Sequence, residues 1–82
     1  MKSNYKESDA FLLHATKFKE TSLLCVFFSK EFGKVSAIAK GARSKKSKFQ
    51  VLTVPGAIFK ITFSGKNELK TLTSCESLET LD

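Results

Sequence analysis

The stretch AIFKITFS, residues 57–64, carries the clearest fold signal of this 82-residue chain. Apolar side chains occupy every second position, at Ala57, Phe59, Ile61 and Phe63. This period of two predicts a β-strand with one buried face, because successive side chains of a strand point to opposite sides of a sheet. The next four residues, GKNE at 65–68, are typical of a hairpin loop leading to a further strand over residues 69–75.

Three more strands are predicted towards the amino terminus, over residues 9–16 (DAFLLHAT), 23–30 (LLCVFFSK) and 34–40 (KVSAIAK). Gly33 stands between the last two and can adopt the left-handed conformation of a tight hairpin. Residues 41–50 (GARSKKSKFQ) show no period of two, so we expect a loop with one helical turn at most.

Five short strands predict an all-β fold, a small five-stranded antiparallel Greek-key barrel of the OB type. Because residues 41–50 are few, we expect the helix that many OB folds carry between strands 3 and 4 to be reduced or absent. A small SH3-like barrel is the main structural alternative. We expect residues 1–8 to be a flexible tail, residues 9–76 the barrel, and residues 77–82 the start of a connection to a carboxy-terminal domain.

The charge is concentrated in the middle of the chain, which has a formal net charge of +6. Residues 33–70 hold nine of the fourteen basic residues but only one of the eight acidic ones. Such asymmetry favours a polyanionic partner, with nucleic acid first and an anionic membrane surface second. A hydrophobic content of 41% is too high for a disordered tail.

The strongest functional signal is a run of cations that no acid interrupts: Lys40, Arg43, Lys45, Lys46 and Lys48. Repeated cations on a loop can neutralise successive phosphates and release counterions. The alternative is a solvated loop that keeps a small domain soluble.

Among the aromatic residues, Phe18 and Phe49 lie next to lysines in predicted loops, where an exposed ring can stack on a base. Phe59 and Phe63 share the apolar face of their strand and are expected in the core. Phe27 and its neighbour Phe28 are adjacent, so one of them should face outwards.

Nothing in the sequence indicates catalysis, a metal site or a cofactor. His14 is the only histidine and has no catalytic partner nearby in the sequence. Cys25 and Cys75 are expected to be reduced, buried thiols of a cytosolic protein. The polar amino terminus lacks the apolar segment of a signal peptide, and no apolar run approaches the length of a membrane helix. We therefore expect a cytoplasmic protein that is not an enzyme.

Three motifs, in the same order, resemble the amino-terminal part of RecO recombination and repair proteins. KETSL at residues 19–23 is similar to the family's Arg/Ser-Glu-Thr-Ser-Leu. FGKV at 32–35 followed by AKGARS at 39–44 resembles its Gly-Arg/Lys-Val and Ala-Lys-Gly-Ala-Arg signature. ELKTL at 68–72 resembles its Glu-Leu/Val-Lys-Thr-Leu segment.

The resemblance implies a bacterial, nucleoid-associated OB-fold module that binds single-stranded DNA, with duplex DNA as an alternative ligand. It further implies annealing of complementary strands and loading of recombinase onto DNA coated with single-strand-binding protein, together with RecR. Lys40, Gly41 and Arg43 match the signature and inherit a DNA-binding role. The resemblance implies the same role for Lys45, Lys46 and Lys48, which form a basic stretch whose sequence varies within the family. It also implies this role for Lys34 and Lys70, which occupy matched positions of the motifs.

Two rival functions stay open. The first is an RNA-binding or protein-docking module of the OB or SH3-like type, since the sequence does not report on recognition of the 2′-hydroxyl. The second is a basic module on anionic membranes, which would require an amphipathic helix where this chain has strands. Binding of DNA and RNA of one sequence, measured side by side, would separate the nucleic-acid alternatives.

Overall fold

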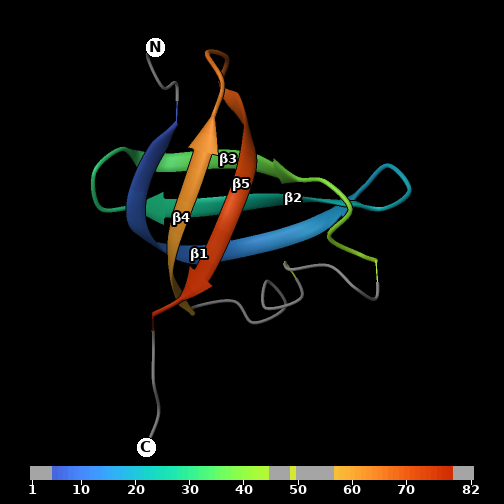
Figure 1. Ribbon diagram of the computed structural model, residues 1–82, viewed down its shortest axis with the longest axis horizontal. Helices are drawn as coiled ribbons and strands as arrows, with labels where there is room; N and C mark the ends of the chain where they lie inside the picture. Colours follow the sequence, from blue (N-terminus) through green and yellow to red (C-terminus); the bar gives the residue numbers. More distant parts are fainter. Residues whose placement is uncertain (1–4, 45–48, 50–56, 79–82) are drawn as a thin grey trace, which may run out of the picture.

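Five strands close into a barrel in the computed structural model of the chain, which describes residues 5–44, 49 and 57–78 (Figure 1). The strands are β1 (Lys6–Phe18), β2 (Ser22–Ser29), β3 (Gly33–Ala39), β4 (Ile58–Ser64) and β5 (Leu69–Ser77). The all-β barrel predicted from the sequence is confirmed. Of the segment between β3 and β4, the described residues form turns and no helix, while residues 45–48 and 50–56 lie outside the described part.

The strand order around the barrel is β1-β2-β3-β5-β4, and β4 pairs with β1 to close the ring. Four of the pairings are antiparallel, but β3 and β5 run parallel along Ser36–Ile38 and Leu69–Thr71. A purely antiparallel barrel was therefore the wrong prediction at this one seam. The reason is geometric, because an odd number of strands cannot alternate in direction all the way around a closed ring.

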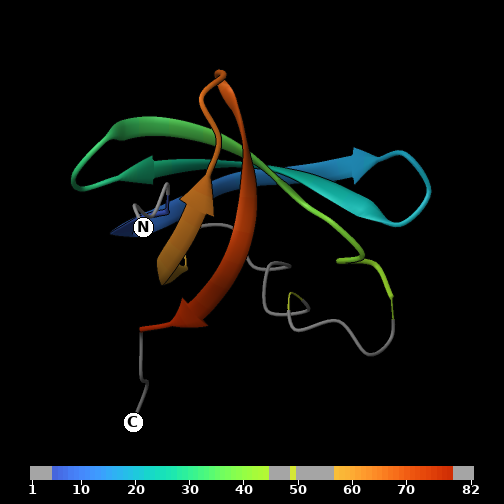
Figure 2. The ribbon, with the colours of Figure 1, turned by 45° about the horizontal axis from the view of Figure 1, so that its top comes forward.

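β1 is the longest strand and belongs to both layers of the barrel. Its first half pairs with β4 and its second half with β2, and its register with β2 shifts between Leu12 and His14. Irregularities of this kind bend a strand and increase its local twist. Figures 1 and 2 show the result, in which the β4–β5 hairpin crosses the layer of β1, β2 and β3 at a steep angle.

β1 also begins earlier than the sequence indicated, at Lys6 instead of residue 9. Residues 6–8 pair with β4, so they belong to the strand and not to the predicted tail. The inward position here is Ser8, whose hydroxyl donates to the Asp9 carbonyl and accepts from the Glu31 amide. A buried but polar residue gives no apolar alternation, which is why the start of the strand was missed.

The core lies on the face predicted from residues 57–64. Phe59, Ile61 and Phe63 are buried, together with Phe27 from β2, whereas Phe28 is 54% exposed. The core cluster also receives Ala10, Leu12, Cys25, Val35, Ala37, Ala39, Ala42 and Leu72. The prediction that one of the two adjacent phenylalanines on β2 faces outwards is confirmed.

Phe49 belongs to this core as well, with only 5% of its surface exposed. The sequence predicted a loop aromatic that is available for stacking, and this is wrong because its ring is buried. The inward side chains of β3 are the small Val35, Ala37 and Ala39. Small residues on this strand leave volume that a large side chain from the following segment can fill.

Candidate nucleic-acid interface

A groove crosses the outside of the barrel between the β1–β2 loop, the end of β3 and the start of β5. We call it the β3–β5 groove; its volume is about 530 Å³, and its lining residues are Phe18, Lys19, Thr21, Ser22, Ile38, Lys40, Gly41, Leu69, Lys70 and Thr71. OB folds bind oligonucleotides on the face of strands 2 and 3, between the loops that join strands 1–2 and 4–5. The groove covers the part of this position next to the β1–β2 loop and extends to the start of β5, while the β4–β5 loop contributes no lining residue.

The chemistry of the groove suits a polyanion. Lys19, Lys40 and Lys70 contribute three lysine side chains to its lining from three separate elements. The described lining residues include no carboxylate, and the hydroxyls of Thr21, Ser22 and Thr71 add hydrogen-bonding groups. Cations of this kind contact phosphates without reading the base, while hydroxyls can position the backbone.

One aromatic ring lies at the end of β1 beside these cations. The Lys19 ammonium is 5.4 Å from the centroid of the Phe18 ring. Phe18 is half-buried, so part of its ring remains accessible from the groove. The structure thus places Phe18, one of the two residues predicted to stack on bases, where a base in the groove could reach it.

Arg43 holds the segment after β3 against the β1–β2 loop. Its guanidinium donates hydrogen bonds to the carbonyls of Lys19 (3.1 Å) and Glu20 (2.8 Å). Its backbone amide donates to the Thr21 carbonyl at 2.9 Å. A guanidinium has five N–H donors, so these two bonds leave others for a phosphate. Arg43 therefore fixes the loop that forms one wall of the groove, in addition to being one of the cations of the basic run.

Gly41 has a left-handed backbone conformation, which favours glycine at this position of the motif. Its φ angle is +70°, and a Cβ atom built on it would meet no atom within 4 Å. A side chain would therefore be strained by the left-handed conformation rather than by crowding. Gly33, predicted to be left-handed in the β2–β3 turn, also has a φ angle of +70°.

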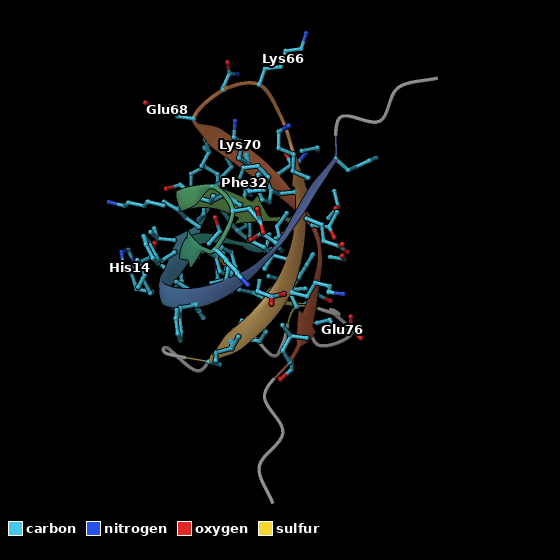
Figure 3. All side chains as sticks on the ribbon, turned by 90° about the vertical axis from the view of Figure 1, so that its left-hand side faces the viewer. His14, Phe32, Lys66, Glu68, Lys70 and Glu76 are labelled. Carbon is cyan, nitrogen blue, oxygen red and sulfur yellow. The ribbon has the colours of Figure 1, made fainter. Side chains whose placement is uncertain are left out.

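The remaining predicted site residues are spread over the molecule. Lys34 lies away from the groove, and Lys70 lines both the groove and a second pocket at the open end of the barrel. Lys45, Lys46 and Lys48 lie outside the described residues. Figure 3 shows Lys70 with Phe32 near the β4–β5 loop and His14 on β1 at a distance from them.

Among the lysines and exposed aromatic residues of these two pockets, three were not predicted as site residues: Lys19 in the groove, and Lys6 and Phe32 in the second pocket. Lys19 could have been found, because it directly follows Phe18 in the loop between the first two strands. Lys6 could not have been found in this way, since no apolar alternation indicates that β1 extends to it.

The two cysteines carry protonated thiols. Burial raises the pKa of Cys25 to about 11, and burial together with the nearby Cys25 raises the pKa of Cys75 to about 12. Both thiols are free; Cys25 is buried as expected, whereas Cys75 is only half-buried. Within the described part of the chain, no group of three or more His, Cys, Asp or Glu side chains could hold a metal ion. The described residues also form no helix long and apolar enough to cross a membrane.

The strand order of the closed barrel is that of an OB fold, and the basic groove lies on its surface. The family model described as "Recombination protein O N terminal" matches residues 1–81, and the chain therefore belongs to this family. The resemblance seen in the three sequence motifs is confirmed.

Curated relatives from several bacteria carry the name DNA repair protein RecO. The relative from Actinobacillus pleuropneumoniae serotype 5b is 44% identical over 66 residues, and the match covers 80% of this chain and 28% of the relative. That from Sodalis glossinidius is 45% identical over 67 residues, covering 82% and 26%, respectively. That from Salmonella dublin is 42% identical over 69 residues, covering 84% and 28%. The chain thus spans little more than a quarter of the length of these relatives.

Proposed function

We propose that this chain is the DNA-binding module of a recombination mediator and that it binds single-stranded DNA along the β3–β5 groove. One observation carries the proposal: three lysines and a half-buried aromatic ring line one groove, without a carboxylate among its described lining residues. Family membership supports the same conclusion, because the relatives are named for DNA repair.

Binding would proceed through the backbone of the DNA. Lys19, Lys40 and Lys70 neutralise successive phosphates, and Phe18 offers a surface on which a base can stack. The other predicted contacts, Lys45, Lys46 and Lys48, continue the row of cations along the sequence beyond Arg43. Because phosphates carry no base identity, this mode gives little preference for sequence.

Within the whole protein, the module would support annealing of complementary strands and loading of recombinase onto DNA covered by single-strand-binding protein, with RecR as a partner. On this proposal the barrel formed by β1 to β5 is the working domain, and the protein acts by binding rather than by catalysis. A bacterial, nucleoid-associated location fits these roles.

A pair of matched double variants tests the groove. Lys19→Gln with Lys40→Gln removes two cations from it, while Lys30→Gln with Lys60→Gln removes two exposed cations elsewhere on the barrel. Each phosphate contact to single-stranded nucleic acid contributes about 0.7 to the slope of log affinity against log salt. The groove variant should therefore flatten the slope by roughly 1.4.

The measurement is fluorescence anisotropy of a labelled oligonucleotide at several salt concentrations, with thermal melting to show that both variants fold. Equal slopes for the two double variants would show that the DNA does not use the groove. RNA of the same sequence serves as the comparison ligand, and tighter binding of RNA would favour the rival RNA-binding function.

A further inference from the structure

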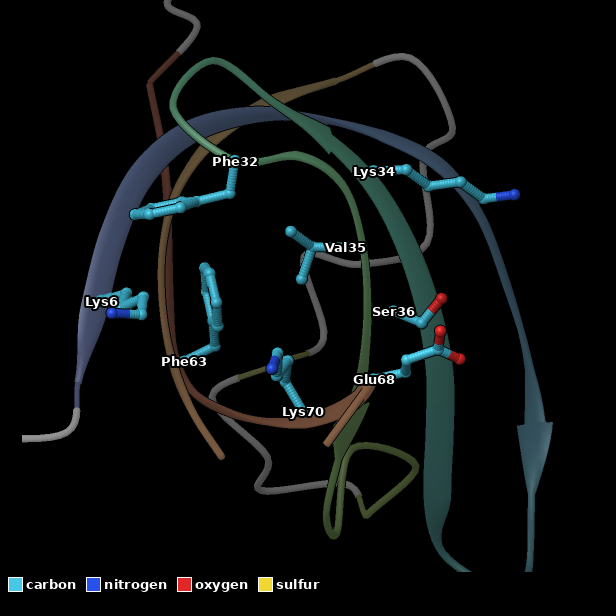
Figure 4. A pocket seen from close by; sticks show the side chains of 8 residues that line it. All are labelled: Lys6, Phe32, Lys34, Val35, Ser36, Phe63, Glu68 and Lys70. Atoms are coloured by element: carbon cyan, nitrogen blue, oxygen red, sulfur yellow. The ribbon is translucent and has the colours of Figure 1, made fainter. Parts of the chain in front are cut away.

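A second pocket opens at the end of the barrel near the β2–β3 turn and the β4–β5 loop (Figure 4). We call it the barrel-mouth pocket; its volume is about 600 Å³, and its lining residues are Lys6, Phe32, Lys34, Val35, Ser36, Phe63, Glu68 and Lys70. This volume falls within the range of about 300–1,000 Å³ in which small-molecule ligands are held. Apart from Lys70, which also lines the β3–β5 groove, none of these residues takes part in the binding mode proposed for the groove.

Phe32 forms an aromatic wall of this pocket in a fixed orientation. Its ring meets the buried Phe63 ring in a T-shaped contact, with 5.6 Å between centroids and 87° between planes. In a T-shaped pair, Phe63 can contact at most one face of Phe32. Phe32 is 45% exposed, which leaves a large part of an oriented ring in solvent.

The turn that carries Phe32 is fixed by buried hydroxyl groups. The Ser29 hydroxyl accepts a hydrogen bond from the Phe32 amide at 2.9 Å and donates one to the Gly33 carbonyl at 2.8 Å. The Ser8 hydroxyl accepts a hydrogen bond from the neighbouring Glu31 amide at 3.1 Å. A ring held in this way loses little conformational entropy when a ligand stacks on it.

One cation lies beside the ring, and a second lines the same pocket. The Lys6 ammonium is 5.8 Å from the centroid of Phe32, and the Lys70 ammonium donates to the Gly65 carbonyl at 3.1 Å. In Figure 4 the Lys34 side chain points away from the pocket, so Lys6 and Lys70 are the cations closest to a ligand there. Glu68 is the one acidic residue among the described lining residues.

We propose that the barrel-mouth pocket holds one nucleotide of single-stranded DNA, with its base stacked on Phe32 and its phosphate near Lys6 and Lys70. The proposal rests on the proposed function, since Lys70 lines both pockets and connects them. The strand would then extend from the β3–β5 groove, past the start of β5, to the mouth of the barrel. The competing explanation is that Phe32 only covers Phe63.

Tryptophan substitutions distinguish the two explanations, because the natural chain contains no tryptophan. Phe32→Trp places a single fluorophore in the barrel-mouth pocket, and Phe18→Trp places one in the groove. Phe28→Trp is the matched control, because Phe28 is 54% exposed and lines neither pocket. Stacking of a base on the indole quenches its emission. Titration with oligo(dT) should quench the tryptophans at positions 32 and 18 and leave the one at 28 unchanged.

Each outcome has one meaning. Quenching at 18 but not at 32, in variants that bind oligo(dT) by anisotropy, would overturn the barrel-mouth proposal and leave the groove intact. Absence of oligo(dT) binding by all three proteins and by the parent would overturn the proposed function itself. Quenching at 32 equal to that at 28 would also count against the pocket.

A second variant guards against a tryptophan that disturbs the turn. Phe32→Leu keeps an apolar cover over Phe63 but removes the aromatic face. We expect it to melt close to the parent and to bind oligo(dT) at least about fivefold more weakly. Phe32→Tyr should restore the affinity, and Lys6→Gln should flatten the salt slope by about 0.7. Parental affinity in a folded Phe32→Leu variant would show that Phe32 is only a cover.

Discussion

Arg43 illustrates how one residue can serve a motif in two ways. In the sequence it is one of several cations, whereas in the structure its guanidinium joins two loop carbonyls across the edge of the groove. The bonds to Lys19 and Glu20 fix the loop that carries Lys19 into the groove. Charge and shape therefore depend on the same side chain and can be separated by substitution.

We expect Arg43→Lys to retain the salt slope of the parent but to lower the free energy of unfolding by about 1 kcal/mol, because the lysine side chain is one bond shorter and its ammonium does not reach the position from which Arg43 Nη1 bonds both carbonyls. Arg43→Ala should lose similar stability and also flatten the salt slope by about 0.7 if Arg43 contacts a phosphate. Urea unfolding and salt titrations measure the two effects. A lysine variant as stable as the parent would contradict the positioning role.

The two thiols should be unreactive in the folded protein. Only the thiolate attacks a thiol reagent, and pKa values raised from 9.0 to about 11 for Cys25 and about 12 for Cys75 leave little thiolate at pH 8. Labelling of the native protein should be about 100-fold slower than labelling of the protein in urea. Fast labelling of either cysteine under native conditions would show that its side chain is accessible.

The same pKa values predict how stability depends on pH. Above pH 9.0 the unfolded chain releases thiol protons that the folded chain keeps up to about pH 11 and 12. The unfolded state thus binds fewer protons, and the free energy of unfolding falls as the pH rises through this window. Comparison with Cys75→Ala isolates the contribution of that thiol, since the lysines and Tyr5 are common to both proteins.

At the scale of the element, β4 is the strand on which the barrel most depends. Phe63 is 2% exposed, and its ring contacts the Phe32 ring in the barrel-mouth pocket. Phe63→Ala should reduce the free energy of unfolding by roughly 3–5 kcal/mol, enough to unfold much of so small a domain. Phe28→Ala is the matched control and should change stability little, because Phe28 is exposed. Equal melting of the two variants would place the core elsewhere.

The elements differ in how well the sequence predicts them, and the differences have physical causes. β4 and the loop after it were predicted almost to the residue, because strict alternation and a glycine mark their bounds. β1 was predicted too short, since a hydrogen-bonded serine replaces an apolar residue at its buried start. The parallel β3–β5 pairing could not be read from local patterns, because it joins segments distant in the chain.

Prediction of the site followed the same rule. The cations near Lys40 stood out as a run in the sequence, but the groove itself depends on Lys19 and Lys70, which only the closed barrel brings together. Phe18 and Phe49 looked alike in sequence, each beside lysines. Tertiary packing separates them, with Phe49 in the core and Phe18 at the groove.

At the scale of the whole molecule, the uneven charge predicts that the proposed binding of single-stranded DNA weakens steeply as the salt concentration rises. The cations of the run that lie beyond Arg43 test how far the interaction extends. Changing Lys45, Lys46 and Lys48 together to Ala should flatten the salt slope by about 2 if all three contact phosphates. The loss should be alike for oligonucleotides of different sequence. If the triple variant folds and keeps the salt slope of the parent, the DNA contacts only the two pockets and not this segment.

The parallel seam between β3 and β5 gives the barrel one place to open without breaking its antiparallel pairings. Separation there would leave an open five-stranded sheet in the order β3-β2-β1-β4-β5, antiparallel throughout. Two unpaired edges would then be exposed, and such edges can pair with other chains and start aggregation. The β3–β5 groove has residues of both strands in its walls, so DNA bound across it would hold the two edges together. A ligand that binds only the closed form stabilises that form by mass action. Bound nucleic acid would therefore protect the barrel from self-association through these two edges for as long as it stays bound.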